Sequence, residues 1–300
     1  MLIGTGELLQ IARHNAFAVG AFNVYNLEGV KAVVAAAEAE NSPAMLQVHP
    51  SSLTYGGTPL VALCLAAAKS AAVPMAVQLD HCSEEADIRT TLEAGIQSVL
   101  ADGSKWSFAD NLAFTRQMTE LAHARGAAVE AEVGRISGTE DGLTVAEKEA
   151  KMTDPEQARE FVQQTQVDAL AVTIGNVHGT YQGEPQLDFE RLDAIRQALS
   201  LPLVLHGASG LPAELIDRSI QLGVAKFNVN TEVRHAYLDF WREYGQANSQ
   251  ADLLDCMKSA TERMQAIVAD KLRLFGSRER APLYQGVASP DRSALSVAAS

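Results

Sequence analysis

Short apolar runs alternate with longer amphipathic stretches along most of the 300-residue chain. The apolar runs are rich in Val, Ala, Leu and Ile and alternate only weakly with polar residues, which is typical of parallel strands covered on both faces. We expect strands at eight of these runs: 18–24, 44–49, 75–81, 98–103, 128–134, 169–175, 201–207 and 225–230. The stretches between them have helical spacing, and Gly126 is placed to end one of the helices.

Eight alternations of strand and helix predict an α/β fold, a (β/α)8 TIM barrel. An open, doubly wound sheet is the alternative. That fold rarely needs eight comparable parallel units, and the first turn here lacks the GxGxxG fingerprint of dinucleotide-binding sheets. The barrel is therefore the favoured fold.

The domain organisation follows from the length and from the C-terminal pattern. A chain of this length can form one large barrel domain. Residues 231–245 and 255–275 have helical spacing beyond the eighth strand. We expect a single barrel with extra C-terminal helices at 1–276, followed by a flexible tail at 277–300 that is rich in Ser, Ala and Pro.

The segment from Gly134 to Thr153 is long, charged and glycine-bearing, whereas barrel loops are usually only a few residues long. A structureless surface insertion is one interpretation. The segment follows the fifth strand on the face where barrels carry their active sites, which favours a lid.

Composition narrows the cellular setting. The net charge is −13 and Lys and Arg form no cluster, which argues against a nucleic-acid partner. The three cysteines cannot all pair within one chain and fit no zinc-finger or redox motif, which favours a reducing compartment. The N-terminus has no basic leader, and the longest apolar run, Leu60 to Ala68, is about half of the roughly 18–20 residues that a membrane helix needs. We expect a cytoplasmic protein without a membrane partner.

Three histidines, His81, His178 and His206, each stand where an expected strand gives way to a glycine or polar turn. The C-terminal ends of barrel strands meet at one mouth, so these imidazoles are expected to converge there. Carboxylates stand near the same strand ends, at Asp80, Asp102 and Glu132. Imidazoles with neighbouring carboxylates suit zinc, with one position left open for a substrate.

Two alternatives remain at this mouth. Each histidine taken alone is more simply a satisfied polar residue at a strand end, although three on one rim favour a metal site. Glu130 is an alternative to Glu132, because alternate residues of a strand share one face.

Two turns have the composition of phosphate loops. Residues 206–210 read HGASG before a helix that begins near Pro212, and residues 228–231 read NVNT. Glycine amides, short polar side chains and a helix N-terminus favour an anion. A structural turn is the alternative for either segment alone, but the loops after the seventh and eighth strands commonly hold phosphate in barrels.

Two other chemistries are less favoured. The run GASGL at 207–211 lacks the last glycine of the GxSxG elbow of serine hydrolases. Lys226, in the eighth strand, could form a Schiff base with a ketone. A complete metal site serves the same electrophilic purpose and makes that lysine redundant.

A family resemblance runs from about Leu8 to Gly276, on the segments GAFNVYNLE, QLDHC, EAEVGRISGTEDG, AVTIGNVHGTYQGEP, LPLVLHGASG and KFNVNTE. On these segments the chain resembles the class II, zinc-dependent ketose-bisphosphate aldolases, in the branch that contains the tagatose-1,6- and fructose-1,6-bisphosphate enzymes. The resemblance implies reversible cleavage of such a bisphosphate, or of a close ketose 1-phosphate, to dihydroxyacetone phosphate and an aldehyde, glyceraldehyde 3-phosphate for the bisphosphates. It also implies a role in glycolysis or related carbohydrate metabolism, and a homo-oligomer, either a dimer or a tetramer.

The resemblance implies metal-binding roles for five residues. His81, His178 and His206 would hold the catalytic zinc ion. Asp102 and Glu132 would serve a second or alternative metal position close by. The expected cofactors are therefore zinc in one or two sites, with a monovalent cation as a further candidate.

The resemblance also implies roles toward the substrate. Asp80 would act as acid and base at the oxygen next to the bond being cleaved. Glu140, in the expected lid, would move the proton at the carbon that becomes the enediolate. The expected substrate contacts are Asn23, Gly179, Gly207, Ser209, Asn228, Asn230 and Thr231.

Several positions depart from the commoner family pattern. His49 stands where relatives often carry Ser or Thr, and Gln182 stands where many fructose-bisphosphate enzymes carry Lys. The segment after the eighth strand lacks the Asp-Pro-Arg motif that supplies an arginine for the far phosphate in many relatives. Arg278 and Arg280 are the candidate substitutes, and the aldehyde half of the substrate stays open.

Two other functions also stay open. The chain could be a non-catalytic partner subunit of a sugar-phosphate aldolase, although the complete metal set and Glu140 argue against that interpretation. A metal-dependent sugar-phosphate isomerase or epimerase is the weaker alternative.

Overall fold

The structure is a computed structural model, and it describes residues 1–140, 143–145, 151–179, 181, 183–247 and 252–287. For 138–140, 143–145 and 245–247 it describes the backbone alone. Eight parallel strands close into a barrel. In order around the barrel they are β1 (Val19–Asn23), β2 (Ala44–Val48), β3 (Met75–Cys82), β4 (Ser98–Ala101), β5 (Ala128–Val133), β8 (Ala169–Val172), β10 (Leu203–Leu205) and β11 (Val224–Val229). All eight expected strands are present, and the barrel is confirmed over the open sheet.

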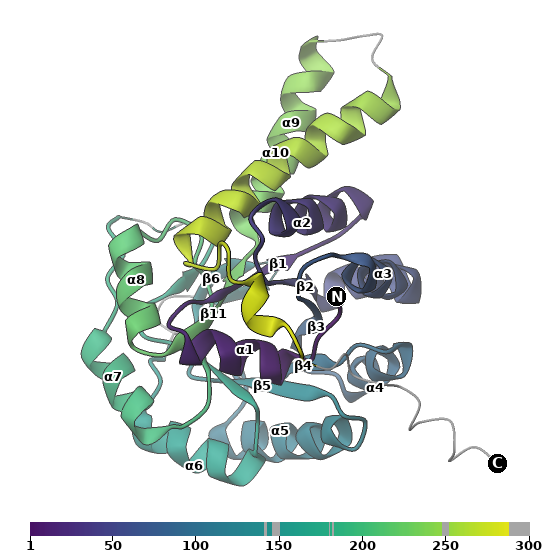
Figure 1. Cartoon of the computed structure of the whole chain (residues 1–300). Helices are drawn as coiled ribbons and strands as arrows, with labels where there is room; N and C mark the ends of the chain where they lie inside the picture. The colour runs from purple at the N-terminus through teal and green to yellow at the C-terminus, as the bar shows by residue number, and fades with distance from the viewer. Residues whose placement is uncertain (141–142, 146–150, 180, 182, 248–251, 288–300) are drawn as a thin grey trace, which may run out of the picture.

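Helices surround the barrel in an outer ring (Figure 1). They are α2 (Leu27–Ala39), α3 (Pro50–Ser70), α4 (Glu85–Ala94), α5 (Phe108–His123), α6 (Pro155–Thr165), α7 (Phe189–Ala198), α8 (Ala213–Gln221) and α10 (Leu253–Leu274). The main apolar core lies between these helices and the outward faces of the strands, which explains why the outward faces are apolar.

The N-terminal end of the barrel is closed by α1 (Thr5–His14). Leu8 and Leu9 on this helix are buried in a second apolar cluster with residues from the barrel interior, such as Met45 and Ala76. Apolar residues therefore fill the N-terminal end of the barrel interior. The polar side chains of the interior lie toward the C-terminal mouth.

Helix α3 is long and apolar enough to span a membrane by length and composition alone. Its helical path is broken at Gly57, where φ is 59°, and its side chains Val61 and Cys64 are buried in the main core. The helix also packs against β2 and β3. We therefore interpret α3 as a core helix of the barrel ring.

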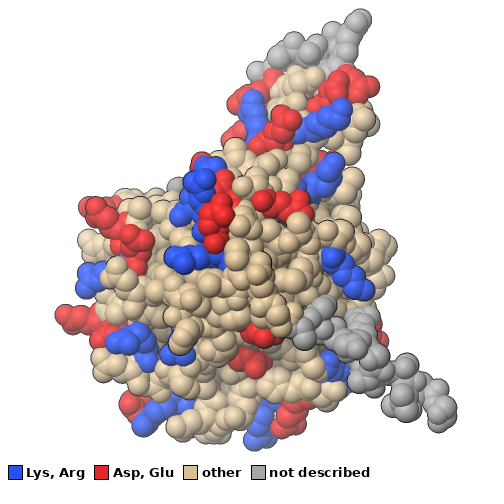
Figure 2. Space-filling view, viewed as in Figure 1, with Lys and Arg blue, Asp and Glu red and all other residues tan. Residues whose placement is uncertain are grey.

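The C-terminal helices form an arm that projects from the barrel (Figure 1). Helix α9 (Thr231–Ala247) packs against α10, with Phe240, Cys256 and Ala260 buried between the two helices. Leucines remain exposed along the arm, at Leu238, Leu253 and Leu254. On the face shown in Figure 2, basic and acidic side chains are intermingled over both the arm and the barrel.

The first part of the expected flexible tail is packed against the barrel, which corrects that expectation. Ser277 is fully buried, and the short 3-10 helix η2 (Ala281–Tyr284) places Tyr284 in the interior cluster, where its hydroxyl donates to the Leu8 carbonyl at 2.9 Å. Residues 288–300 lie outside the described part of the chain.

The same segment corrects the expectation for the far phosphate. Arg278 pairs with Glu40 at 3.3 Å, and the Arg280 guanidinium lies 5.8 Å from the centre of the Phe17 ring. Glu40 follows α2, and Phe17 precedes β1, so both contacts lie at the N-terminal end of the barrel. The two arginines are therefore at the opposite end from the expected substrate site.

Candidate active site

The three predicted histidines converge at the C-terminal mouth of the barrel. His81 lies near the end of β3, His206 directly follows β10, and His178 belongs to a short strand, β9 (Val177–His178). The centre of the His81 ring is 4.6 Å from that of His206 and 5.3 Å from that of His178. One ligand atom from each of the three lies within 4.8 Å of the others. This spacing allows all three to contact one ion.

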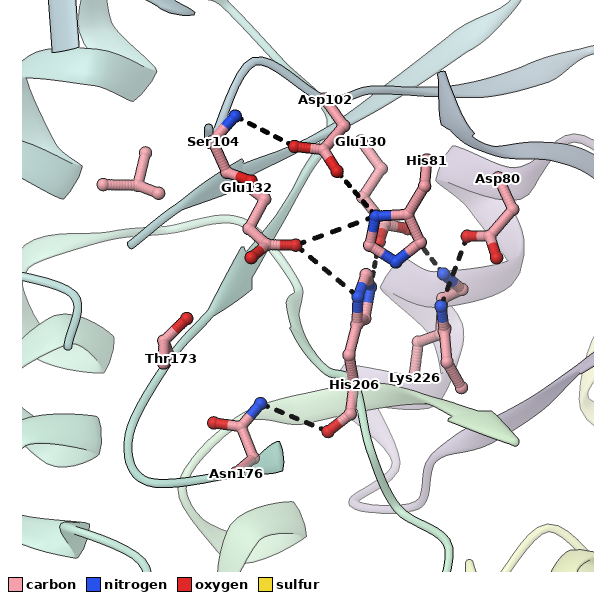
Figure 3. Close-up of polar contacts among 12 residues, drawn as sticks. Asp80, His81, Asp102, Ser104, Glu130, Glu132, Thr173, Asn176, His206 and Lys226 are labelled. Atoms are coloured by element: carbon pink, nitrogen blue, oxygen red, sulfur yellow. Dashed lines mark hydrogen bonds and ion pairs between the residues drawn. The ribbon is translucent and has the colours of Figure 1, made fainter. Parts of the chain in front are cut away.

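The hydrogen bonds of two of these rings fix which nitrogen faces the centre (Figure 3). His81 Nδ1 lies 2.7 Å from Asp102 Oδ2, and His206 Nε2 lies 3.1 Å from Glu130 Oε1. The other ring nitrogens, His81 Nε2 and His206 Nδ1, are buried and make no hydrogen bond to the described residues. Metal-binding histidines have this arrangement, with one nitrogen held by a carboxylate and the other directed at the ion.

Glu132 brings a carboxylate to the same centre. Its Oε2 is buried, lies 3.6 Å from His206 Nδ1 and makes no hydrogen bond to the described residues. Burial, together with the nearby charge of Asp102, raises the pKa of Glu132 to about 8 despite the opposing charge of His81. Two buried carboxylates that repel each other favour a cation between them. His81, Asp102 and Glu132 also form a second set with ligand atoms within 4.8 Å of one another.

Asp102 itself is well paired. Its Oδ1 accepts from the Ser104 amide at 2.9 Å, and its Oδ2 contacts His81. Burial acts to raise the pKa of Asp102, but the hydrogen bonds and charge of His81 and the contacts of Ser104 hold it below its usual range. Asp102 therefore orients His81 as an ionised carboxylate and remains close enough to contribute to the second set.

Asp80 is held beside the histidines by amide donors. Its Oδ2 accepts from Asn23 Nδ2 at 2.8 Å, and its Oδ1 accepts from Gln47 Nε2 at 3.0 Å and from Asn228 Nδ2 at 3.4 Å. Burial acts to raise the pKa of Asp80, but the positive charges of His81 and other groups nearby lower it. The result is a buried carboxylate that is oriented at both oxygens.

Lys226 and Glu130 form a buried ion pair below this centre. Lys226 Nζ lies 2.7 Å from Glu130 Oε2, and both side chains are almost fully buried (Figure 3). Burial acts to raise the pKa of Glu130, but the charge of Lys226 and the contacts of His206 lower it to about 2. A Schiff base needs an amine that can reach the ketone, and Lys226 is instead held in a buried ion pair with Glu130, which argues against Lys226 as a nucleophile.

Glu130 and Glu132 of β5 are the two alternatives for the metal-binding glutamate, and the ion pair helps to distinguish them. Glu132 belongs to one of the two candidate metal sets and lies 3.6 Å from His206 of the other, whereas Glu130 belongs to neither set and contacts Lys226 and His206. Both side chains face the barrel interior, as alternate residues of one strand should. Glu132 therefore has the better geometry for an ion, and Glu130 has the geometry of a supporting residue.

Comparison with known proteins decides the family. The family model described as class-II fructose-bisphosphate aldolase matches residues 4–280. The chain belongs to this family.

Solved structures of other aldolases are similar over nearly the whole chain. A Coccidioides immitis protein, provisionally named as a fructose-1,6-bisphosphate aldolase, is 38% identical, with a TM-score of 0.88 over 93% of this chain and 98% of that chain. The YdjI aldolase of Escherichia coli K12 is 32% identical, with a TM-score of 0.84 over 94% of this chain and 100% of its own. Fructose-bisphosphate aldolase of Campylobacter jejuni shares the fold at 22% identity, with a TM-score of 0.76 over 93% and 96% of the two chains. The chain is thus a lyase of the aldolase type.

The two turns predicted to bind phosphate lie side by side at the mouth of this aldolase. The Ala208 amide donates to the Asn228 carbonyl at 3.4 Å, which joins the turn after β10 to the end of β11. Ser209 is nearly buried, and Asn230 Oδ1 accepts from the Tyr25 hydroxyl at 2.7 Å. The Gly210 amide is already used, because it donates to Glu232 Oε1 at 2.7 Å. Thr231 begins α9, at the N-terminus of a helix.

Gly207 holds the first of these turns against the strand that carries His178. Its φ is +67°, and an added Cβ would lie 2.0 Å from the Val177 carbonyl oxygen. The Gly207 carbonyl in turn accepts from the Tyr181 hydroxyl at 2.9 Å. Gly179 also has a positive φ, 90°. The glycines of this region therefore serve close backbone approach as well as any anion contact.

We predict that Gly207→Ala will destabilise the protein more than a matched glycine substitution. Gly126 has a similar φ of +70°, but an added Cβ there meets no atom within 4 Å. Gly126→Ala should show only the cost of backbone strain, whereas Gly207→Ala should cost about 1–3 kcal/mol more in the free energy of unfolding because the Val177 backbone must move. Urea denaturation of both variants measures the difference. Equal losses would show that the turn can relax freely.

The expected lid contains a hairpin that is anchored beside His178. Strand β6 (Ser137–Glu140) pairs with β7 (Leu143–Val145) and, on its other edge, with β9, where Gly138 is the register partner of His178. Arg135 and Lys151 close the base of the segment by pairing with each other. Glu140 ends β6, and its side chain lies outside the described part of the chain, as does Gln182.

Several polar residues at the mouth are not among the site residues that the sequence predicts. His49 is buried, its ring centre lies 6.4 Å from that of His81, and its Nδ1 accepts from the Ser51 amide at the start of α3. Its position at the end of the second strand is the same signal that identified the other histidines. Gln47 and Gln78 are fully buried polar residues of inner strands, which is the signal that could have identified them.

Proposed function

We propose that this protein is a zinc-dependent aldolase that reversibly cleaves a ketose 1,6-bisphosphate to dihydroxyacetone phosphate and glyceraldehyde 3-phosphate. Tagatose-1,6-bisphosphate and fructose-1,6-bisphosphate are the proposed substrates, with a close ketose 1-phosphate as the alternative. The observation that carries the proposal is the cluster of His81, His178 and His206 next to a carboxylate, Asp80, that amide donors hold at both oxygens.

The residues present fit a divalent ion. Buried ring nitrogens of His81 and His206 are directed inward without hydrogen bonds to the described residues, and the Glu132 carboxylate is directed at the same space. His81, His178 and His206 would hold zinc, with Glu132 and Asp102 at a second or alternative position. A bound zinc ion supplies a Lewis acid for the charge that develops on the ketone oxygen.

The protein's own groups would supply the proton transfers. Cleavage next to a ketone requires removal of a proton from the hydroxyl on the far side of the bond, and Asp80 is an oriented carboxylate that can accept it. Asn23 and Asn228 would keep Asp80 in place through their hydrogen bonds. Glu140, at the end of β6, is proposed to transfer the proton at the enediolate carbon, while the hairpin excludes water.

The phosphate of the dihydroxyacetone portion is proposed to lie on the paired turns after β10 and β11. Their hydrogen bond at Ala208 keeps the two turns adjacent, and α9 begins at the same place with its N-terminus toward the mouth. A helix N-terminus favours an anion. The proposed contacts are Asn23, Gly179, Gly207, Ser209, Asn228, Asn230 and Thr231, and a monovalent cation is a further proposed ligand.

The far end of the substrate has a second candidate region. Asn23 lines a cavity of about 250 Å³ that extends to Arg234 and Tyr237 on α9. This cavity offers space to the far end of the substrate, and its surface is mostly apolar. Arg278 and Arg280 cannot reach it from the other end of the barrel. The similarity to the YdjI aldolase keeps other ketose phosphates as the alternative to a bisphosphate.

The purified chain, assayed alone against a panel of ketose bisphosphates and 1-phosphates, should release dihydroxyacetone phosphate, detected by a coupled reductase. Borohydride added with substrate should trap no adduct at Lys226, because the proposed chemistry forms no imine. Turnover only after a second protein is added would show a helper subunit instead. Products with the mass of the substrate would show an isomerase or epimerase.

We further propose a cytoplasmic homo-oligomer, a dimer or tetramer, with a role in carbohydrate metabolism such as glycolysis and with neither nucleic acid nor membrane as partner.

A further inference from the structure

A continuous chain of buried hydrogen bonds joins Asp80 to His206 across the barrel interior. Gln47 Nε2 donates to Asp80 Oδ1 and to Gln78 Oε1, each at 3.0 Å. Gln78 Nε2 donates to Glu130 Oε2 at 3.0 Å, and Glu130 Oε1 contacts His206 Nε2 at 3.1 Å. We call this chain, from Asp80 through Gln47, Gln78 and Glu130 to His206, the amide relay. Each of its side chains is at most 1% exposed. Water therefore cannot replace these contacts readily.

The ion pair with Lys226 gives the amide relay a direction. Glu130 lies 2.7 Å from the Lys226 ammonium, and an ionised carboxylate can only accept hydrogen bonds. Gln78 must therefore present its NH2 group to Glu130 and its carbonyl to Gln47. Gln47 must then present its NH2 group to Gln78, and the second hydrogen of that group is directed at Asp80.

The same carboxylate orients His206. A bond from Nε2–H to Glu130 Oε1 leaves Nδ1 as the nitrogen with a lone pair, and Nδ1 faces Glu132 and the other imidazoles. One buried carboxylate thus determines the tautomer of a proposed metal ligand. Through two glutamines it also determines which atoms surround Asp80.

We infer that Glu130 is a positioning residue for both halves of the site, orienting His206 toward the metal and Asp80 toward the substrate, with Gln47 and Gln78 transmitting its orientation. Lys226 supplies the counter-charge that keeps Glu130 an acceptor. The inference rests on the proposed aldolase function for the roles of Asp80 and His206. It assigns Lys226, a lysine in the interior of an aldolase barrel, to support and not to imine formation.

The amide relay is tested at Gln78, which touches neither Asp80 nor any proposed metal ligand. Gln78→Met keeps the length of the side chain and removes its hydrogen bonds. We expect kcat to fall roughly 10- to 100-fold, with KM and the zinc dissociation constant unchanged, because Asp80 loses its fixed neighbours while His206 keeps Glu130. The matched control is Ser42→Ala, which removes a buried hydrogen bond of 2.9 Å to Ser277 at the other end of the barrel and should leave kcat unchanged.

A double-mutant cycle separates transmission from simple destabilisation. If Gln47 and Gln78 act as one unit, the variant with both changed to Met should lose no more kcat than Gln47→Met alone. Losses that multiply would mean that each glutamine acts by itself, and this result would overturn transmission. Wild-type kcat in folded Gln78→Met would do the same.

The His206 half is tested without any activity measurement. Glu130→Met alone would leave a buried ammonium without a partner, so the pair Glu130→Met with Lys226→Met is used instead. Its zinc dissociation constant, from competition with a chromophoric chelator, should rise roughly 10- to 100-fold. Wild-type affinity in this folded variant would overturn the inference. A wild-type protein that binds zinc but cleaves no ketose phosphate would refute the aldolase proposal alone, because the zinc measurement still decides the role of Glu130.

Discussion

Removal of divalent ions with a chelator is expected to lower cleavage of the ketose phosphate by on the order of 10³-fold or more, and zinc should restore it. The proposed ligands explain the size of the effect. Stabilisation of the developing oxyanion by a bound ion contributes several kcal/mol, and each 1.36 kcal/mol changes the rate tenfold. Lys226, the buried lysine of the barrel interior, is already paired with Glu130 and would not replace the ion as an electrophile.

The experiment uses the full chain, dialysed against chelator, with activity and thermal midpoint followed as zinc is added back. The midpoint should rise with zinc, because an ion that binds the folded state alone stabilises it by mass action. His206→Ala should abolish both responses, while His14→Ala, on the helix that closes the opposite end of the barrel, should retain both. Full activity in the metal-free protein would contradict the proposed chemistry, as would a thermal midpoint that ignores zinc.

The barrel could be predicted because its physical cause is visible along the chain. Strands covered on both faces must be apolar, and the eight apolar runs correspond to the eight strands that form the barrel. The ends of the strands do not follow from this rule. The run expected at 201–207 is a strand only at Leu203–Leu205, because His206 and Gly207 already belong to the mouth.

The histidines and carboxylates could be found for a similar reason. The barrel rule converts a position at a strand end into a position at one mouth, and no pairing register is needed for that step. His178 shows the limit of the rule. It lies in β9, a strand of two residues outside the barrel, and so short a strand has no periodicity to detect.

The amide relay could not be predicted because it depends on register. Gln47 and Gln78 face each other as register partners of β2 and β3, and this pairing is set by the closure of the barrel. Glu130 reaches Gln78 across the interior, at a distance of 52 residues in sequence. A single sequence shows which residues share a face, but it does not show which of them meet.

The prediction of a flexible tail is wrong for its first part. The Ser, Ala and Pro content of the tail is typical of mobile segments, but composition does not show that two of its residues are buried. Ser277 donates to the Leu272 carbonyl and contacts Ser42, and Tyr284 fills part of the interior cluster below the barrel. A large aromatic residue near the end of a chain can bury enough surface to hold a short segment in place.

Asp80→Asn is expected to lower kcat by about 10²- to 10⁴-fold while leaving the zinc dissociation constant unchanged. The loss corresponds to removal of a positioned general base. Asn has almost the same shape as Asp, but the neighbouring groups make this substitution more disruptive than the similar shape suggests. Both Asp80 oxygens accept hydrogen bonds, from Asn23 at one and from Gln47 and Asn228 at the other, so the new NH2 group would face a donor in either orientation.

Asp102→Asn gives the matched comparison, because Asp102 is also a buried carboxylate at the same mouth but is bonded to His81 at 2.7 Å. Its substitution should weaken zinc binding roughly 10- to 100-fold, and added zinc should recover much of the lost activity. Zinc should recover none of the activity lost in Asp80→Asn, since Asp80 belongs to neither set of candidate ligands. Stopped-flow cleavage at saturating zinc, with the zinc affinity of each variant measured separately, distinguishes the two roles. If both variants recovered together, Asp80 would act through the metal and the assignment of the base would have to move to another residue.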